Sequence, residues 1–267
     1  MRYFVEQDAR PDNRSGVPIL EIAGLTKRFL GVTAVDHVDL ALKPGELVSL
    51  IGPNGSGKTT LFNCLTGYLA ADGGTVRFRG QDITGAPPHR ICRLGIGRTF
   101  QLVSVFGTMS LMENMLVAAQ QHQEEDLLSR LVRSPRLRGL EKEAIERARL
   151  LLDLVGLSDH AAVLAGHLSY GQRKLLAFAA ALMPEPALLL LDEPAAAINP
   201  TMIRQMMEHV RRLHRHGTTV LLVEHNMDVV MDISQRVIVL DHGQKIAEGS
   251  PAEIRRDPRV VEAYFGR

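Results

Sequence analysis

The sequence predicts an α/β fold with a largely parallel sheet. Three short apolar runs, at residues 47–51, 187–191 and 219–223, have the continuous hydrophobicity of strands that are covered on both faces. Segments with helical spacing separate these runs, and this alternation is typical of parallel sheets. The region from residue 110 to about 157 shows helical spacing and almost no strand pattern. We therefore expect a helical insertion carried on an α/β core.

The remaining strands are predicted from two patterns. Residues 35–42 and 75–79 place apolar side chains at roughly every second position, which suits strands with one buried face. Residues 237–240 repeat the continuously apolar pattern of a buried strand.

Helices are predicted from their starting residues and their apolar stripes. Capping-box sequences at 110–113 and 250–253 each mark the beginning of a helix. Residues 140–155 carry one apolar stripe, and residues 201–215 form a helix before a glycine.

Composition narrows the class of protein. The chain has 267 residues, a net charge of +1 and 45% hydrophobic residues, which excludes general disorder. The near-neutral balance argues against a protein that binds nucleic acid through many phosphates. Two cysteines are too few for a disulfide framework and favour a reducing compartment. No apolar stretch approaches the ~20 residues of a membrane-spanning helix.

The start of the chain mixes charges and lacks an apolar core, so we expect no secretory signal there. Residues 1–17 are expected to be a mobile tail, followed by a single domain at 18–267.

The strongest functional motif is the segment GPNGSGKT at residues 52–59, which fits the phosphate-loop pattern G-x-x-x-x-G-K-[ST]. It follows a predicted strand and precedes a helix-forming segment, as this loop requires. Its glycines let backbone N–H groups point at phosphate oxygens, and the helix presents its positive end. Lys58 is expected at the β- and γ-phosphates and Thr59 on Mg²⁺. The expected nucleotide contacts are Gly52, Asn54, Gly55, Ser56, Gly57, Lys58, Thr59 and Thr60.

The alternative for this motif is a glycine-rich turn with an exposed lysine. The strand before it and the helix after it favour the phosphate loop.

Two carboxylates follow the predicted strand at 187–191. Asp192 is expected to hold Mg²⁺, directly or through water, and Glu193 to polarise the attacking water as general base. Strands often end in acids at their solvated edge, so the pattern alone is weak. Next to a phosphate loop it indicates a catalytic pair.

The segment Leu168-Ser169-Tyr170-Gly171-Gln172 precedes an apolar helical run. Ser169 and Gln172 have the spacing of a capping box, so one interpretation is a well-capped helix start. The other is a γ-phosphate site, because a helix N-terminus with a hydroxyl and an unobstructed glycine N–H attracts anions. The motif by itself leaves both open.

The order of these motifs identifies a resemblance. The phosphate loop, Gln101, LSYGQ, LLLLDE and Glu224-His225 follow one another as in the ATP-binding subunit of ABC transporters, which the chain resembles over roughly residues 19–266. The linker QQHQEEDLLSRLVRSPRLRG, the segments DEPAAAINP and VEHNMDVVMDIS, and the ending VVEAYFGR are similar to LivG-type ATPases of branched-chain amino-acid importers. The resemblance implies a RecA-like P-loop NTPase core, an antiparallel β subdomain and a helical subdomain inserted at about 102–175.

The resemblance also implies roles for single residues. Phe29 is expected to stack on adenine, the alternative being a core phenylalanine beside a strand. Gln101 is expected to reach Mg²⁺ and the attacking water, and His225 to contact the γ-phosphate. The implied metal ligands are Thr59, Gln101 and Asp192, and the implied catalytic residues are Glu193, His225 and Gln101.

A head-to-tail dimer follows from the same resemblance. Ser169, Gly171 and Gln172 would then bind the ATP held by the phosphate loop of the partner. Two features depart from the family pattern: Tyr170 stands where glycine is commonest, and residues 195–199 lack the serine and aspartate of the common D-loop. The other nine histidines, including His209, His214 and His216 along one predicted helix, are expected to be solvated.

The implied function is that of an energy-coupling ATPase of a membrane importer, with ATP and Mg²⁺ as cofactors. Its partners would be membrane permease subunits, a second ATPase that is a copy or a paralogue, and indirectly an extracytoplasmic solute-binding protein, but no nucleic acid. Such a subunit is peripheral to the cytoplasmic face of the inner membrane. Residues 101–112 would accept a coupling helix of the permease, or else pack the helical insertion on the core.

The expected cargo is a branched-chain or other hydrophobic amino acid. Urea, short amides or another amino acid are alternatives, because the ATPase does not touch the cargo. A soluble ABC-type ATPase of DNA repair or translation is a further alternative.

Overall fold

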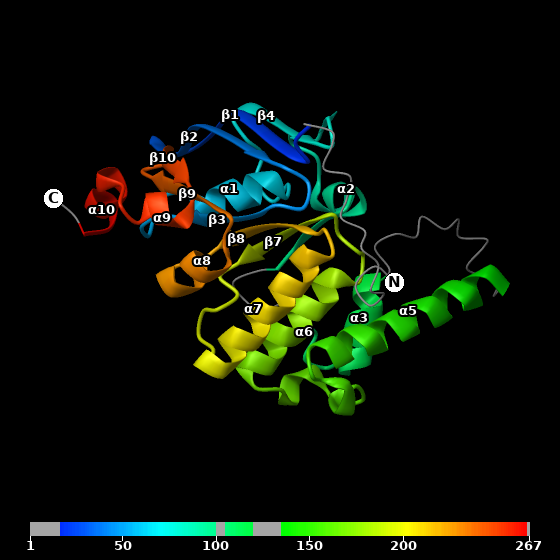
Figure 1. Cartoon of the computed structure of the whole chain (residues 1–267). Helices are drawn as coiled ribbons and strands as arrows, with labels where there is room; N and C mark the ends of the chain where they lie inside the picture. The colour runs from blue at the N-terminus through cyan, green and yellow to red at the C-terminus, as the bar shows by residue number, and fades with distance from the viewer. Residues whose placement is uncertain (1–16, 100–104, 120–134, 266–267) are drawn as a thin grey trace.

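A computed structural model describes residues 17–99, 105–119 and 135–265 of the chain. At its centre is a six-stranded sheet with the order β10-β9-β3-β8-β7-β6, parallel throughout except for β10. An antiparallel sheet with the order β2-β1-β4-β5 lies above it in Figure 1, and most of the helices lie below. The expected α/β fold with an antiparallel β part is therefore confirmed.

The strands of the central sheet have three to six residues, and the two longest strands, with 10 and 11 residues, are in the antiparallel sheet. The central strands are β3 (Leu47–Ile51), β6 (Ile96–Arg98), β7 (Leu188–Asp192), β8 (Thr219–Val223), β9 (Arg236–Asp241) and β10 (Gln244–Gly249). The antiparallel strands are β1 (Leu20–Phe29), β2 (Val32–Leu42), β4 (Gly73–Phe78) and β5 (Gln81–Asp82).

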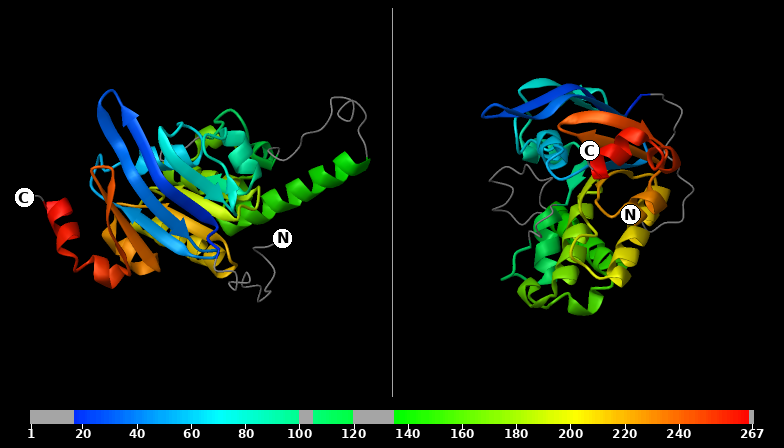
Figure 2. Two further views of the ribbon diagram at one scale, coloured as in Figure 1. Left: turned by 90° about the horizontal axis from the view of Figure 1, so that it is seen from above. Right: turned by 90° about the vertical axis from the view of Figure 1, so that its left-hand side faces the viewer.

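The longest helix, α5, projects beyond the rest of the molecule in Figure 2. No helix in the described part of the chain has the length and hydrophobicity that a membrane crossing requires. The α-helices are α1 (Lys58–Leu65), α2 (Pro88–Arg93), α3 (Leu111–Ala119), α5 (Pro135–Leu154), α6 (Tyr170–Leu182), α7 (Pro200–Arg215), α8 (Met227–Ile233), α9 (Pro251–Ile254) and α10 (Pro258–Phe265), with 3₁₀ turns η2 (Ser158–His160) and η3 (Ala165–His167).

Strand β7 is continuously apolar because it contributes side chains to a core on each face of the central sheet. Successive side chains of a strand point to opposite faces. Leu189 and Leu191 pack with α3, α5, α6 and α7, whereas Leu188 and Leu190 pack with α1 and the antiparallel sheet. Each face of the central sheet thus has its own core, and both cores need apolar residues from the same strand.

The predicted capping boxes are confirmed. Ser110 and Glu113 exchange hydrogen bonds before α3, and Ser250 and Glu253 do so at the start of α9. These reciprocal bonds satisfy N–H groups that a helix start leaves unpaired.

The expectation that the histidines of α7 are solvated is wrong for two of them. His209 and His214 are half-buried, and the ring of His209 stacks on Phe178 with centroids 6.4 Å apart. Burial lowers the pKa of both histidines. Both lie on the flank of the apolar face of α7, which packs against α6.

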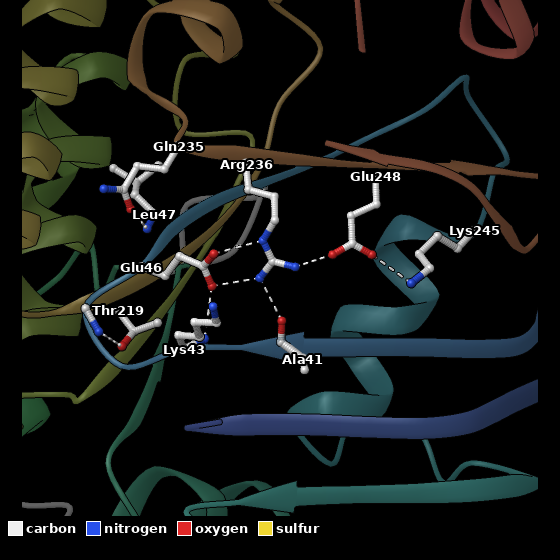
Figure 3. A network of polar contacts seen from close by, with 10 residues as sticks. Ala41, Lys43, Glu46, Leu47, Thr219, Gln235, Arg236, Lys245 and Glu248 are labelled. Atoms are coloured by element: carbon white, nitrogen blue, oxygen red, sulfur yellow. Dashed lines mark hydrogen bonds and ion pairs between the residues drawn. The ribbon is translucent and has the colours of Figure 1, made fainter. Parts of the chain in front are cut away.

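Arg236 joins the two sheets through the polar network of Figure 3. Its guanidinium donates to both carboxylate oxygens of Glu46, at 2.8 and 2.7 Å, and to the Ala41 carbonyl of β2 at 2.7 Å. It also pairs with Glu248 of β10. Glu46 in turn accepts from the Lys43 N–H at 2.9 Å. A bidentate pair of this kind holds the β2–β3 turn firmly against β9.

We expect Arg236→Ala to lower the free energy of unfolding by about 2–3 kcal/mol, because two partly buried carboxylates each lose an ion-pair partner and the Ala41 carbonyl loses a donor. Urea unfolding measures this change. Arg149→Ala is the matched control, since its pair with Glu146 is exposed and should be worth less than about 0.5 kcal/mol. Equal losses in the two variants would contradict the role given to the network.

Candidate functional site

The parallel strand order brings the predicted motifs to one edge of the central sheet. Strands β3, β8, β7 and β6 are neighbours in that order and run in one direction. Their carboxyl ends therefore meet at the same edge, which is where open α/β sheets bind ligands. The phosphate loop follows β3, Glu224 and His225 follow β8, Glu193 follows β7, and Arg98 ends β6.

Two glycines of the phosphate loop are required by its close packing. Gly52 has a φ of +151°, and a Cβ built there would lie 2.0 Å from the Leu240 carbonyl oxygen. Gly57 has a φ of +99°, and its Cβ would lie 2.2 Å from the Ala34 carbonyl oxygen. The loop is thus clasped between β9 and β2. Any side chain at either position would displace the backbone that must approach a phosphate.

The loop ends in a helix start with free N–H groups. Gly57 is the N-cap of α1 and provides no side-chain cap, and the first turn of α1 holds no acidic residue. The first N–H groups of a helix have no partner within the helix, and they carry the positive end of its dipole. Thr59 is exposed and Thr60 half-buried beside this end. The start of α1 therefore suits an anion.

Lys58 places a buried ammonium in the loop. The residue is 5% exposed, and its Nζ donates to the carbonyls of Gly52 and Pro53, both at 2.8 Å, and to Ser56 Oγ at 3.2 Å. Burial lowers the pKa of Lys58, while the charges of Glu193 and Asp192 oppose that shift. The ammonium and both carboxylates therefore belong to one electrostatic cluster. Asn54 and Gly55 are exposed at the tip of the loop.

Asp192 has one carboxylate oxygen paired and one without a partner. Arg98 Nη2 donates to Asp192 Oδ2 at 2.9 Å, and Arg98 Nη1 is held by Asn63 and Thr66, at 2.8 Å each. Asp192 Oδ1 is buried and accepts no hydrogen bond from the described residues. Burial raises the pKa of Asp192 in spite of the bond from Arg98. A buried, unpartnered carboxylate oxygen is a suitable ligand for a hard cation.

The donor set near Asp192 fits Mg²⁺. This ion prefers oxygen ligands and is usually bound by one or two protein groups together with phosphates and water. Asp192 supplies a carboxylate oxygen, and Thr59 supplies an exposed hydroxyl in the first turn of α1. The described residues contain no group of three or more His, Cys, Asp or Glu side chains that could hold a metal ion by themselves. The carboxylate of Asp192 and the hydroxyl of Thr59 are oxygen donors of the kind that suits a cation whose other ligands are phosphate and water.

Glu193 and His225 are in direct contact. His225 Nε2 lies 2.5 Å from Glu193 Oε1, and the Glu193 N–H donates to the Val223 carbonyl at 2.9 Å. Glu193 has a φ of +48°, in the left-handed region that side chains other than glycine rarely adopt. Such strain persists only where the surroundings hold it, and it is common at functional sites. The imidazole and the strained backbone together fix the direction of the carboxylate.

Glu224 has a structural role that its local sequence does not predict. It is 2% exposed and accepts hydrogen bonds from the N–H groups of Ala195 at 2.6 Å, His225 at 3.1 Å and Asn226 at 3.4 Å. Burial raises its pKa, and these bonds oppose the shift. Its carboxylate therefore joins the turn after β7 to the turn after β8. Only the folded chain reveals this role, because Ala195 lies 29 residues away.

The signature residues make a separate group at the start of α6. Ser169 Oγ accepts from the Gln172 N–H at 3.3 Å, and Gln172 Oε1 accepts from the Ser169 N–H at 3.0 Å, so the capping box is formed. Ser169 and Tyr170 are exposed. A Cβ at Gly171 would lie 2.4 Å from Met202 Sδ. The capped helix start and an exposed hydroxyl coexist, so the capping box does not exclude anion binding.

The remaining expectations concern Phe29, Gln101 and the permease-binding strip at residues 101–112. Phe29 ends β1 with 42% of its surface exposed, and Lys27 Nζ lies 5.4 Å from its ring centroid. Its exposure argues against a core role. Gln101 lies outside the described residues, as does the first part of the expected permease-binding strip. Within the described part of that strip, Phe106 is 54% exposed, whereas Val105 packs against the helical core.

Asn199 has a structural role in the D-loop, residues 195–199, whose sequence differs from the common pattern. Its side chain accepts from the Met202 N–H at 2.9 Å and caps α7, with Pro200 in the first turn. The amide thus replaces the aspartate of the common pattern as a helix cap, a task for which both residue types are suited.

A family model described as "ABC transporter" matches residues 35–196, more than half of the chain. The chain belongs to the ABC transporter ATPases. A second model, described as "Branched-chain amino acid ATP-binding cassette transporter", matches residues 244–267 of this ABC ATPase. The LivG protein of Escherichia coli strain K12, a high-affinity branched-chain amino acid transport ATP-binding protein, is 45% identical over 250 residues, which cover 93% of this ATPase and 98% of LivG.

Solved structures of ABC cassettes share the fold. A nucleotide-free ATP-binding cassette from an ABC transporter has a TM-score of 0.81 and 36% identity, covering 94% of this ATPase and all of that chain. A dimeric cassette bound to ADP and phosphate in a post-hydrolysis state has a TM-score of 0.75 and 25% identity, with 87% and 98% covered. The chain is thus an ATP-binding, ATP-hydrolysing subunit of a membrane transporter.

The raised pKa of Glu224 makes stability depend on pH. A carboxyl whose pKa is raised by folding stabilises the folded state fully below its unfolded pKa, and this stability is lost as pH rises through the folded pKa. We therefore expect the free energy of unfolding of the parent to fall relative to that of Glu224→Gln as pH rises above 4.5, the ordinary value. The size is about 1.4 kcal/mol for each pKa unit of the shift. Urea unfolding across pH measures it, and a difference that stays constant would contradict the assignment.

Proposed function

We propose that this ATPase powers an importer of branched-chain or other hydrophobic amino acids. The observation that carries the proposal is the cluster of Lys58, Asp192, Glu193 and His225 at one edge of the sheet, in a chain that is 45% identical to LivG over 93% of its length. The match of the C-terminal residues 244–267 to a branched-chain amino acid transporter model supports the cargo. The site supports ATP hydrolysis, and the relatives support what the hydrolysis drives.

Binding of ATP is assigned to the phosphate loop and β1. The ammonium of Lys58 and the N–H groups of residues 52–60 would bond the β- and γ-phosphates, and exposed Phe29 would stack on adenine. Asp192 and Thr59, with Gln101, would hold Mg²⁺. When bound, this ion neutralises charge on the phosphate oxygens.

Hydrolysis is assigned to Glu193. Its carboxylate would accept a proton from the attacking water while the water oxygen bonds to the γ-phosphorus and the bond to the β–γ bridging oxygen breaks, releasing ADP and phosphate. His225, at 2.5 Å, would hold the carboxylate and contact the γ-phosphate. The strained backbone of Glu193 supports this role, because it fixes the base before the substrate arrives.

The second half of each ATP site would come from a second ATPase subunit. Ser169, Gly171 and Gln172 would bind the γ-phosphate held by the partner's phosphate loop, in a pair of identical or paralogous chains. The dimer of a related cassette with ADP and phosphate supports this arrangement. Exposure of the Ser169 hydroxyl at a helix N-terminus supports it independently.

The dimer would bind permease subunits at the cytoplasmic face of the membrane and drive their conformational change. ATP binding would close the two ATPases and drive the permease to one access state, and hydrolysis would reopen them. Exposed Phe106, before α3, is the described residue of the 101–112 strip that is best placed to meet a permease helix. An extracytoplasmic solute-binding protein would deliver the cargo.

Glu193→Gln tests the catalytic assignment. The amide cannot accept the proton, so we expect ATPase activity to fall at least about 100-fold while ATP affinity stays within about 2-fold. The variant should also accumulate as a dimer with ATP and Mg²⁺ in size-exclusion chromatography. Glu143→Gln, an exposed change on α5, is the control and should keep parental activity. Parental turnover in Glu193→Gln would refute the general base.

Reconstitution tests the cargo. Capture of the tagged ATPase from membranes should recover permease subunits, and the complex can be placed in liposomes with its solute-binding protein. We expect leucine, isoleucine or valine to raise ATPase activity at least about 3-fold. Urea and acetamide serve as controls and should leave the activity unchanged. Stimulation by the amides alone would overturn the cargo and leave the ATPase assignment in place.

A further inference from the structure

Lys174 is a buried lysine whose donors all bond to one backbone turn. It lies on α6, two residues after the signature, and is 6% exposed. Its Nζ donates to the carbonyls of Glu193 at 2.8 Å, Pro194 at 3.3 Å and Ala196 at 2.6 Å. An ammonium has three N–H groups, so this turn takes all of them. We call residues 193–198 the catalytic turn.

The burial of this charge needs an explanation beyond packing. Burial lowers the pKa of Lys174, while the charges of Glu224 and Glu193 oppose the shift. The ring of Tyr170 lies 5.6 Å from Nζ. An apolar residue of similar length would fill the same space without losing hydration, so a position that only packs does not need an ammonium. The hydrogen bonds from the ammonium to the carbonyl groups of the catalytic turn therefore explain why a lysine is buried here.

The catalytic turn is strained and depends on outside support. Glu193 has a φ of +48° and Ala197 a φ of +58°. Residues other than glycine are strained in this region, and they persist there only when neighbouring groups hold them. Lys174 bonds the carbonyl groups of the turn, and Glu224 bonds the Ala195 N–H. The first support comes from the signature helix and the second from the end of β8.

The start of α6 is also packed tightly against the end of the turn. A Cβ at Gly171 would lie 2.4 Å from Met202 Sδ and 3.5 Å from Ile198 Cγ2. The signature helix therefore has little free space in which to slide past the turn. A displacement of its first residues must move the turn as well, because Lys174 bonds to the turn one helical turn further on.

We propose that Lys174 is a positioning residue that transmits movement of the signature helix to Glu193. This proposal rests on the dimer of the proposed function. There, Ser169 and Gly171 bind the ATP of the partner, while Glu193 of the same chain acts on its own ATP. When the signature docks on the partner's ATP, Lys174 would move with α6 and shift Glu193 at the chain's own ATP. The lysine thus couples the two sites across a D-loop that lacks the usual serine and aspartate.

Lys174→Met tests the proposal, with Lys174→Arg as the rescue variant. Methionine keeps the length and removes all three donors, so we expect kcat to fall at least about 10-fold and the Hill coefficient for ATP to fall to about 1. Affinity of the isolated subunit for a fluorescent ATP analogue should stay within about 2-fold, because the phosphate loop is untouched. Arginine retains several donors and should recover most of the cooperativity.

Lys142→Met is the matched control, because Lys142 is exposed on α5 and loses the same charge. It should keep parental kcat and Hill coefficient. Parental values in Lys174→Met, or a parental Hill coefficient of 1, would overturn the proposal. Parallel losses of thermal stability, ATP affinity and kcat in both Lys174 variants would also overturn it, since they indicate a structural role alone. Full turnover in Glu193→Gln is a separate result, which refutes the general base on which the proposal rests, whereas parental values in Lys174→Met refute the coupling and leave the base in place.

Discussion

Lys58 shares a buried edge of the parallel sheet with two carboxylates, and the rest of the site depends on how these charges are paired. Charges removed from water are costly unless they are hydrogen-bonded. The loop carbonyls accept from Lys58, Arg98 bonds Asp192, and His225 bonds Glu193. These partners come from the ends of different strands. The strand order β3-β8-β7-β6 therefore makes the cluster stable, and it also aims the cluster at one ligand position.

The turn that carries Glu193 is the second feature on which function depends. Its positive φ angles would relax if the turn were isolated, so the strain is held by contacts from elsewhere. Lys174 and Glu224 hold opposite polar groups of the same backbone segment. The carboxylate proposed as the general base is therefore positioned by groups from two other segments, α6 and the end of β8.

Much of the fold follows from local patterns, and the exceptions have physical causes. Strands β3 and β8 match the predicted runs, because strands buried on both faces must be continuously apolar. Strand β1 is not among the predicted strands, since register shifts between Ile22 and Leu25 interrupt its alternation. Strand β6 has three residues and is defined by pairing with β7 more than by its own sequence.

The phosphate-loop motif, the two acids after a buried strand and the capped start of α6 are predictable without the fold, because each depends on residues that are close in the chain. The roles of Phe29 and Gln101 come from the resemblance alone and stay predictions, and Gln101 lies outside the described residues. The pairing of Arg98 with Asp192 and the bond from Lys174 to the turn of Glu193 become visible in the folded chain alone. These contacts join segments 94 and 19 residues apart, and their approach is set by strand order and helix packing, which no local pattern encodes.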